Sequence, residues 1–268
     1  MNVWQYLLKQ YMALPQMHIQ VNQLKKDCEL NKNFLILYKK FCPGPITFVL
    51  KLKKKSRISR IVTNNKKTVA VRFPKNKLTQ KLLKLLKYPL AAPSANISTK
   101  ISPVSKDDVK EEFGNKIKFI LDGGRSKIGL ESTIISLVGK PKILRLGGIE
   151  RSKINKVLNK NIKYDKTNKK ITMPGQSKLH YSPGIPIKLN TAKPKPNEAF
   201  ILIKKRKKSY KNYYYLSKTK NLKQAAKNLY RVLRKIKNKK YKSIVVEKIP
   251  NIGFGEVIND RLKKASVK

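Results

Sequence analysis

The chain has 268 residues, of which 40% are hydrophobic, so it can form one large folded domain or two smaller ones, and two fit its pattern better. Its 64 Lys and Arg against 14 Asp and Glu give a net charge of +50. The two cysteines form no CxxC pair and share no metal-ligand spacing with the two histidines, which argues against a disulfide framework and a zinc site.

The positive charge comes mainly from lysine, with 54 Lys and 10 Arg spread along the chain. Such an excess is typical of a protein that binds a polyanion with salt-sensitive affinity. It is equally typical of a lysine-rich solvated surface produced by compositional drift, and the two interpretations stay open. Residues 51–60 and 204–211 are the best candidates for an RNA-binding face.

The chain lacks an apolar run as long as a membrane span. Its first residues also lack the apolar core and small-residue cleavage site of a signal peptide. We therefore expect a cytoplasmic protein without a membrane partner.

The first part of the chain alternates predicted helices and strands. Apolar residues at helical spacing predict a helix over 21–38, and Pro43-Gly44-Pro45 stops any helix before the next strand. Polar residues without apolar periodicity predict a surface excursion over 159–170. Mixed strands and helices around one sheet indicate the α/β class. Strands are predicted at 46–52, 68–73, 89–92, 117–121, 133–137 and 142–145, and helices at 78–86, 105–114 and 151–158.

The last part of the chain has the pattern of a small α/β unit. The apolar stripe of its long helix predicts core packing rather than a binding surface. Three consecutive tyrosines, 213–215, could stack on bases, but a buried or edge strand with alternating aromatic faces is the safer interpretation. Strands are predicted at 199–203, 213–216 and 243–247, and helices at 222–236 and 256–265.

Three small polar turns, each attached to an apolar run, predict one anion-binding site. They are residues 91–96 (AAPSAN), 130–134 (LESTI) and 143–148 (ILRLGG). Ser, Thr and Asn after an apolar segment favour the turn where a strand ends or a helix begins. Turns of this kind present backbone N–H groups to phosphate or carboxylate.

These turns, preceded by residues 43–47 (PGPIT) and 68–74 (TVAVRFP), resemble the YrdC-type threonylcarbamoyl-adenylate synthases from about 18 to 149. Residues 173–183 resemble the linker of the two-domain branch of that family, and 253–262 resemble the closing helix of its extra domain. The resemblance implies an α/β fold in three parts. They are a YrdC-like twisted mixed sheet with helices in 1–158, a linker folding over the active site in 159–190, and a small Rossmann-like α/β domain in 191–268.

The resemblance also implies a reaction. L-threonine, bicarbonate and ATP are joined into threonylcarbamoyl-AMP with release of pyrophosphate, and a downstream tRNA threonylcarbamoyl transferase uses the product beside the anticodon. Such chemistry requires positioning residues rather than a nucleophile. The cofactor implied is Mg²⁺ bound with ATP, held mainly by the phosphates rather than by a metal site in the protein.

Residue roles follow from the same resemblance. Arg72 should pair with the threonine carboxylate, because a planar guanidinium can form two parallel hydrogen bonds to it. Tyr181 should close over the ATP and exclude water, the alternative being a linker aromatic docked on its own domain. Leu146 stands where the family usually has proline. The implied threonine contacts are His18, Arg72, Ala92 and Ser132, and the implied ATP contacts are Thr68, Ser94, Asn96, Ser102, Arg145 and Tyr181.

The family normally begins with a strand and a basic segment that precede the position of His18, and residues 1–10 do not resemble them. We therefore expect the chain to be shortened at its N-terminus. Three explanations compete: a start site placed too far downstream, a decayed copy, or a site restored by other lysines such as Lys9.

A second functional class stays open. The scaffold could be a non-catalytic module that binds RNA, such as tRNA or double-stranded RNA, or the ribosome through its lysine surface. A carbamoyl-transfer domain of the hydrogenase-maturation type is disfavoured, because the accessory domains of that family do not occur here.

Overall fold

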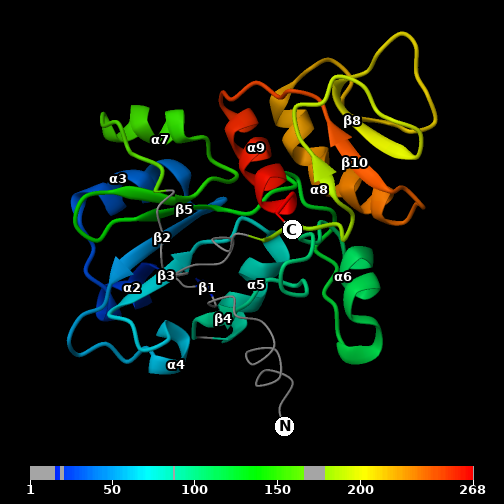
Figure 1. Cartoon of the computed structure of the whole chain (residues 1–268). Helices are drawn as coiled ribbons and strands as arrows, with labels where there is room; N and C mark the ends of the chain where they lie inside the picture. The colour runs from blue at the N-terminus through cyan, green and yellow to red at the C-terminus, as the bar shows by residue number, and fades with distance from the viewer. Residues whose placement is uncertain (1–15, 19–20, 87, 166–178, 268) are drawn as a thin grey trace. The chain divides into compact units, whose positions relative to one another are not determined.

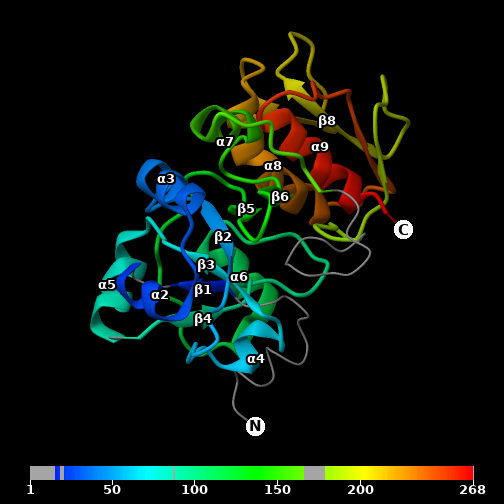
Figure 2. The same ribbon diagram turned by 90° about the vertical axis from the view of Figure 1, so that its left-hand side faces the viewer.

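The computed structural model describes residues 16–18, 21–86, 88–165 and 179–267 (Figures 1 and 2). These residues form two compact units. Unit 1 takes its described residues from 1–94 and 131–176, and unit 2 takes its described residues from 95–130 and 177–268. The domain boundaries predicted at 158 and 190 stay a prediction. Lys9 and the linker residues 173–178 lie outside the described residues.

Unit 1 is built on a six-stranded mixed sheet with the strand order β4-β1-β3-β2-β5-β6. The pairs β1 with β3 and β2 with β5 are parallel, and the other pairs are antiparallel. This sheet confirms the predicted twisted mixed architecture. The strands are β1 Gln16–His18, β2 Ile46–Lys51, β3 Thr68–Arg72, β4 Leu90–Ala92, β5 Thr133–Ser136 and β6 Lys142–Arg145.

One face of this sheet packs against α3 (Lys32–Phe41). The ring of Phe34 on α3 lies 5.0 Å from the ring of Phe48 on β2, and both side chains are fully buried. Side chains alternate along a strand, so the neighbours of Phe48 point to the opposite face. Helix α7 packs against α3 (Figure 1). The other helices of unit 1 are α2 Val21–Asp27, α4 Arg60–Thr63 and α5 Lys77–Leu86, and α7 spans Arg151–Leu158.

The helix predicted over 21–38 is wrong in one respect, because the structure divides it into α2 and α3. The division is made by Asn31, whose Oδ1 accepts a hydrogen bond from the Phe34 backbone N–H at 3.0 Å and caps α3. Cys28, which directly follows α2, forms a β-bridge with Leu52. Apolar periodicity continues across this break, so it did not reveal the cap.

The strand predicted over 117–121 is also wrong, because these residues form no strand. Phe119 and Leu121 are 88% and 64% exposed, so the apolar run is not buried in a sheet. The surface excursion predicted over 159–170 is described only as far as residue 165, where residues 159–161 and 163 are exposed but the segment also contacts the fold. There, Ile162 is buried and Tyr164 forms a β-bridge with a β6 residue.

Unit 2 is built on a four-stranded parallel sheet with the order β7-β10-β8-β9. Its two long helices, α8 and α9, lie together on one side of the sheet (Figures 1 and 2). This second sheet, which is parallel, and its helices confirm the predicted small α/β unit. Its elements are α6 Lys106–Phe113, β7 Ile187–Lys188, β8 Glu198–Lys204, β9 Tyr213–Ser217, α8 Leu222–Lys237, β10 Ser243–Val246 and α9 Phe254–Ala265, with a 3₁₀ turn at Gly114–Lys116.

Apolar side chains on α8 and α9 and on the strands β10, β8 and β9 make the core of unit 2. The stripe predicted on the long helix is buried, from Ala225 to Ile236. β9 is an edge strand on which Tyr214 is buried, whereas Tyr213 and Tyr215 are half-buried against Phe200, Leu202 and Val245. The predicted edge strand with alternating aromatic faces is confirmed. Within the described ranges, each helix is too short or too polar to span a bilayer.

Glu198, the first residue of β8, is a buried carboxylate that accepts several hydrogen bonds. Its Oε1 accepts hydrogen bonds from Lys188 Nζ at 2.7 Å and Ser243 Oγ at 2.7 Å, and its Oε2 accepts one from the Lys195 N–H at 2.8 Å. These bonds, led by the one from Lys188, lower the pKa of Glu198 from 4.5 to about 2.

We therefore predict a pH-dependent loss of stability that E198Q removes. The depressed pKa stabilises the folded state above pH 4.5, and this contribution is lost as the pH falls toward 2. Urea unfolding between pH 7 and pH 2.5 should show E198Q less stable than wild type at pH 7, with the difference shrinking in acid. A difference that stays constant over this range would contradict the assignment.

Candidate functional site

One level of the unit 1 sheet aligns polar residues from four strands. Arg72 at the end of β3 lies opposite Thr47 on β2 and His18 on β1. Thr47 is the neighbour of Ile134 on β5, which in turn lies opposite Arg145 on β6. Residues directly opposite each other in a sheet point to the same face, so Arg72, Thr47 and Arg145 belong to one face. The side chain of His18 lies outside the described part of the chain.

A buried hydrogen-bond network, here called the Ser132 network, joins Thr47, Ser132 and Arg145. The two hydroxyl oxygens, Thr47 Oγ1 and Ser132 Oγ, are 2.7 Å apart. Arg145 donates from Nε and Nη2 to the Ser132 carbonyl at 3.1 and 2.9 Å, and from Nη2 to Ser132 Oγ at 3.1 Å. Thr47 and Ser132 are fully buried and Arg145 is 3% exposed, so the network joins three strands in the interior of unit 1.

Gly147 lets the turn after β6 lie directly on Ser132. A Cβ atom at Gly147 would come within 2.5 Å of both the Glu131 carbonyl oxygen and the Ser132 carbonyl carbon, so only glycine fits there. The next glycine, Gly148, donates its N–H to the Glu131 carbonyl at 2.8 Å. The residue between Arg145 and these glycines, Leu146, is buried.

Arg72 is the side chain of this face with an unused hydrogen-bond donor for a ligand. Its Nε is buried and has no hydrogen-bond partner among the described residues. Burial first, and then the positive charge of Arg145, lower the pKa of Arg72 from 12.5 to about 10, while Glu131 acts in the opposite direction. A buried guanidinium near a like charge is stabilised by an anion that pairs with it.

The predicted site residues of unit 1 lie at different levels along the strands. Thr68 is at the other end of β3 from Arg72 and lies opposite Lys51, so roughly 13 Å of strand separates the two. Ala92 ends β4, two residue pairs from His18. Ser94 follows β4 and is exposed. The sheet level itself therefore brings together His18, Arg72, Ser132 and Arg145.

The other predicted residues belong to unit 2. Asn96 is buried, and its Nδ2 donates to the carbonyls of Ile97 at 2.9 Å and Lys100 at 3.3 Å. Its Oδ1 is buried without a hydrogen-bond partner among the described residues, so it can accept a bond from a ligand. Ser102 is 9% exposed in the segment that leads to α6.

Tyr181 is docked within unit 2. It has a left-handed backbone with φ of 63° and is 1% exposed. Its ring stacks on Tyr230 of α8 at a centroid distance of 5.7 Å, and the Arg261 guanidinium of α9 lies 4.7 Å from its ring centre. The structure thus shows the arrangement that the sequence offered as the alternative to a lid, and the contact between Tyr181 and ATP stays a prediction.

Sequence reasoning missed Thr47, Glu131 and Gly147 as parts of the site. Thr47 and Gly147 stood inside the motifs that carried the resemblance, and Glu131 precedes Ser132 directly. The available signal was the period of two along β2, which places Thr47 on the face opposite to Phe48.

Neither metal ligation nor thiol chemistry is suggested by the described residues. They contain no group of three or more His, Cys, Asp or Glu that could hold a metal ion. Burial raises the pKa of Cys28 and of Cys42 to about 12, so both are protonated thiols at neutral pH rather than nucleophiles.

Fold and site together define an α/β protein with two arginines at one end of a mixed sheet, of which Arg145 is buried and Arg72 is half-buried with a buried Nε. A family profile described as telomere recombination matches residues 8–147, and one described as the C-terminal domain of threonylcarbamoyl-AMP synthase matches 149–267. The chain belongs to the two-domain threonylcarbamoyl-AMP synthase family.

Relatives from distant organisms support this family assignment. The threonylcarbamoyl-AMP synthase of Pyrococcus abyssi is 33% identical over 95% of this chain and 78% of its own length, and that of Bacillus subtilis is 33% identical over 86% and 72%. The crystal structure of P. abyssi Sua5 complexed with L-threonine superposes with a TM-score of 0.85 at 30% identity. It covers 98% of this chain and 84% of the archaeal one.

We predict that T47V and S132A will not be additive in stability, because both remove the same buried bond. Each single variant should lower the free energy of unfolding by about 1 to 3 kcal/mol. The double variant should cost about 1 kcal/mol less than the sum, measured by urea unfolding.

The matched control is T63V, which removes another buried threonine hydroxyl in unit 1, bonded to the Arg60 carbonyl at 3.2 Å. Its effect should add to that of S132A. An additive T47V/S132A pair would show that the Ser132 network does not link β2 to β5.

Proposed function

We propose that this chain makes threonylcarbamoyl-AMP from L-threonine, bicarbonate and ATP, with release of pyrophosphate. The observation that carries the proposal is the buried Nε of Arg72, which lacks a partner among the described residues beside the Ser132 network. Family membership supplies the reaction, and this guanidinium supplies a place for the one permanent anion of the amino acid.

The threonine carboxylate would pair with Arg72. A planar guanidinium offers two parallel donors to a carboxylate, and burial strengthens the bond because water does not compete. The Ser132 network would hold this face in position, because Ser132 Oγ and Thr47 Oγ1 are fully buried and lie within hydrogen-bonding distance of each other. His18, Ala92 and Ser132 remain proposed threonine contacts.

ATP binding is proposed for the remaining residues of the predicted set. Asn96 has a buried acceptor for a donor group of the nucleotide, and Arg145 carries the positive charge next to Arg72. Magnesium would enter with the nucleotide and bind mainly through its phosphates. Thr68, Ser94, Ser102 and Tyr181 complete the proposed ATP contacts.

The protein needs to position reactants rather than form a covalent intermediate. The threonine amine takes up the carbon of bicarbonate, water leaves, and a carbamate oxygen attacks the α-phosphorus of ATP. The bond from that phosphorus to the β-phosphate bridging oxygen breaks, and pyrophosphate leaves. Fixed cations that stabilise the phosphate charge, and a carboxylate held in one orientation, supply the catalysis.

The product is a reactive mixed anhydride. We propose that it is passed to a tRNA threonylcarbamoyl transferase, as the family role in tRNA modification implies. ATP and tRNA meet in the cytoplasm, which is where we place the reaction.

The direct test is pyrophosphate release by the purified chain with ATP, bicarbonate and Mg²⁺, with and without L-threonine. Release that requires threonine supports the proposal. Release at the same rate without an amino acid, or no release in either case, contradicts it for this chain.

We predict that R72Q raises the KM for threonine about tenfold to a hundredfold, because a charge-assisted hydrogen bond contributes about 1.5 to 3 kcal/mol. The KM for ATP should change less than threefold. R72K should recover only part of the affinity, since it keeps the charge but loses the planar pair of donors.

The control R57Q removes an exposed guanidinium of unit 1 and should change neither constant. A rise in the KM for ATP alone in R72Q would assign Arg72 to the nucleotide instead of the amino acid.

A further inference from the structure

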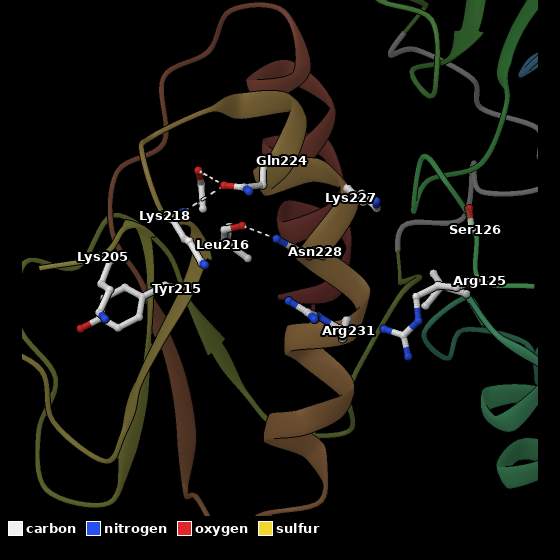
Figure 3. Close-up of a pocket in the computed structure, with 12 residues that line it drawn as sticks. Arg125, Ser126, Lys205, Tyr215, Leu216, Lys218, Gln224, Lys227, Asn228 and Arg231 are labelled. Atoms are coloured by element: carbon white, nitrogen blue, oxygen red, sulfur yellow. Dashed lines mark hydrogen bonds between the residues drawn. The ribbon is translucent and has the colours of Figure 1, made fainter.

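An open groove of about 570 Å³ lies along the first half of α8 in unit 2. β9 and residue Lys205 form one wall, and the segment with Arg125 and Ser126 forms the other (Figure 3). None of its lining residues belongs to the site of Arg72. Five cations line it, namely Arg125, Lys205, Lys218, Lys227 and Arg231.

The groove charges are not compensated. None of the described residues that line it is Asp or Glu, and none of its five cations takes part in an ion pair with another described residue. Neighbouring arginines differ in this respect. Arg206 pairs with Glu247 at 3.2 Å, and Arg234 lies 3.5 Å from Glu112.

Arginine has a larger share of the groove's cations than of the chain's. Arginine makes up 10 of the 64 basic residues of the chain, but two of the five in the groove. Arginine presents a planar fork of donors that matches phosphate oxygens, whereas lysine acts as a point charge. Figure 3 shows Arg231 on α8 and Arg125 on the segment that forms the wall opposite β9.

The groove floor is held in place by hydrogen bonds. Gln224 Oε1 accepts from Ser217 Oγ at 2.6 Å and from the Lys218 N–H at 2.9 Å, and Asn228 Nδ2 donates to the Leu216 carbonyl at 2.8 Å (Figure 3). These bonds join the end of β9 to the helix face that carries the cations. The cations therefore project from a fixed surface.

The second wall is fixed to α8 by Gly129. This glycine has φ of 72°, and a Cβ atom there would lie 2.2 Å from the Lys227 carbonyl oxygen. The Gly129 N–H also donates to Ser126 Oγ at 3.0 Å. The backbone after Arg125 therefore touches the helix directly, which sets the width of the groove.

The open form of the groove favours a strand of phosphates over a single small anion. Residues 224, 227, 228 and 231 share one helix face about 10 Å long, which is longer than a single phosphate group. The groove also continues into the exposed basic segment 204–211 through Lys205. A small phosphate compound would be expected in a more enclosed pocket.

We propose that this groove, here called the α8 groove, binds the phosphodiester backbone of RNA through Arg125, Arg231 and the three lysines. The contacts are to phosphates, so they give affinity and orientation rather than sequence readout. The choice of RNA rests on the proposed function, which serves tRNA, but the test below does not depend on synthase activity.

The test measures binding of the full chain to a fluorescein-labelled tRNA transcript by anisotropy, over 50 to 300 mM KCl. R125Q/R231Q should weaken binding about tenfold or more at 100 mM and lower the slope of log affinity against log salt by about 1.5 to 2. Thermal unfolding within a few degrees of wild type shows that the variant is folded.

The control R57Q/R60Q removes two exposed arginines of the other basic cluster, 51–60, and so the same net charge. It should weaken binding less than threefold. An equal loss in both pairs would overturn the proposal, because binding would then follow total charge. The proposal is also wrong if inorganic tripolyphosphate stabilises wild type but not R125Q/R231Q while both bind RNA equally, since the groove would then take a small polyphosphate.

Discussion

The Ser132 network is the interaction on which the site depends. It joins the starts of β2 and β5 to the end of β6, and it uses the buried hydroxyls of Thr47 and Ser132 together with the guanidinium of Arg145. Buried polar groups that are mutually bonded specify one arrangement, because any shift leaves a donor or acceptor unpaired in a low-dielectric interior. The network thereby fixes the strand register that places Arg72 beside Arg145.

Carboxylates are scarce in this chain, and this makes a buried cation without a carboxylate partner informative. With 14 acidic residues against 64 basic ones, the chain has too few carboxylates to pair with every cation, and a buried cation needs a partner. Several acidic residues are accordingly used inside the fold, such as Glu198 with Lys188 and Asp260 with Arg261. A guanidinium that is buried without such a partner, as Arg72 is at its Nε, therefore marks a place for an anion from outside.

Much of the fold could be predicted from sequence because local patterns and global packing agree. The strands around Val49, Ala70 and Ile134 alternate or run apolar as a buried sheet requires, and α8 carries a clean apolar stripe. The wrong predictions have a common cause. The periodicity of apolar residues indicates that a segment is buried, but it does not indicate which other segment packs against it. Residues 117–121 are apolar enough for a strand but find no neighbouring strand among the described residues. The hydrogen bond between Thr47 and Ser132 joins residues 85 positions apart, so no local sequence pattern predicts it.

The account rests on Arg72 binding the carboxylate of the amino acid, and calorimetry can test this without turnover. L-threonine and L-threoninol, which has a hydroxymethyl group in place of the carboxylate, would be titrated into the full chain in separate experiments. We expect threonine to bind and threoninol to bind at least tenfold more weakly, because threoninol gives the guanidinium no charged partner. Equal affinity for the two compounds would contradict the role given to Arg72 and the site built around it.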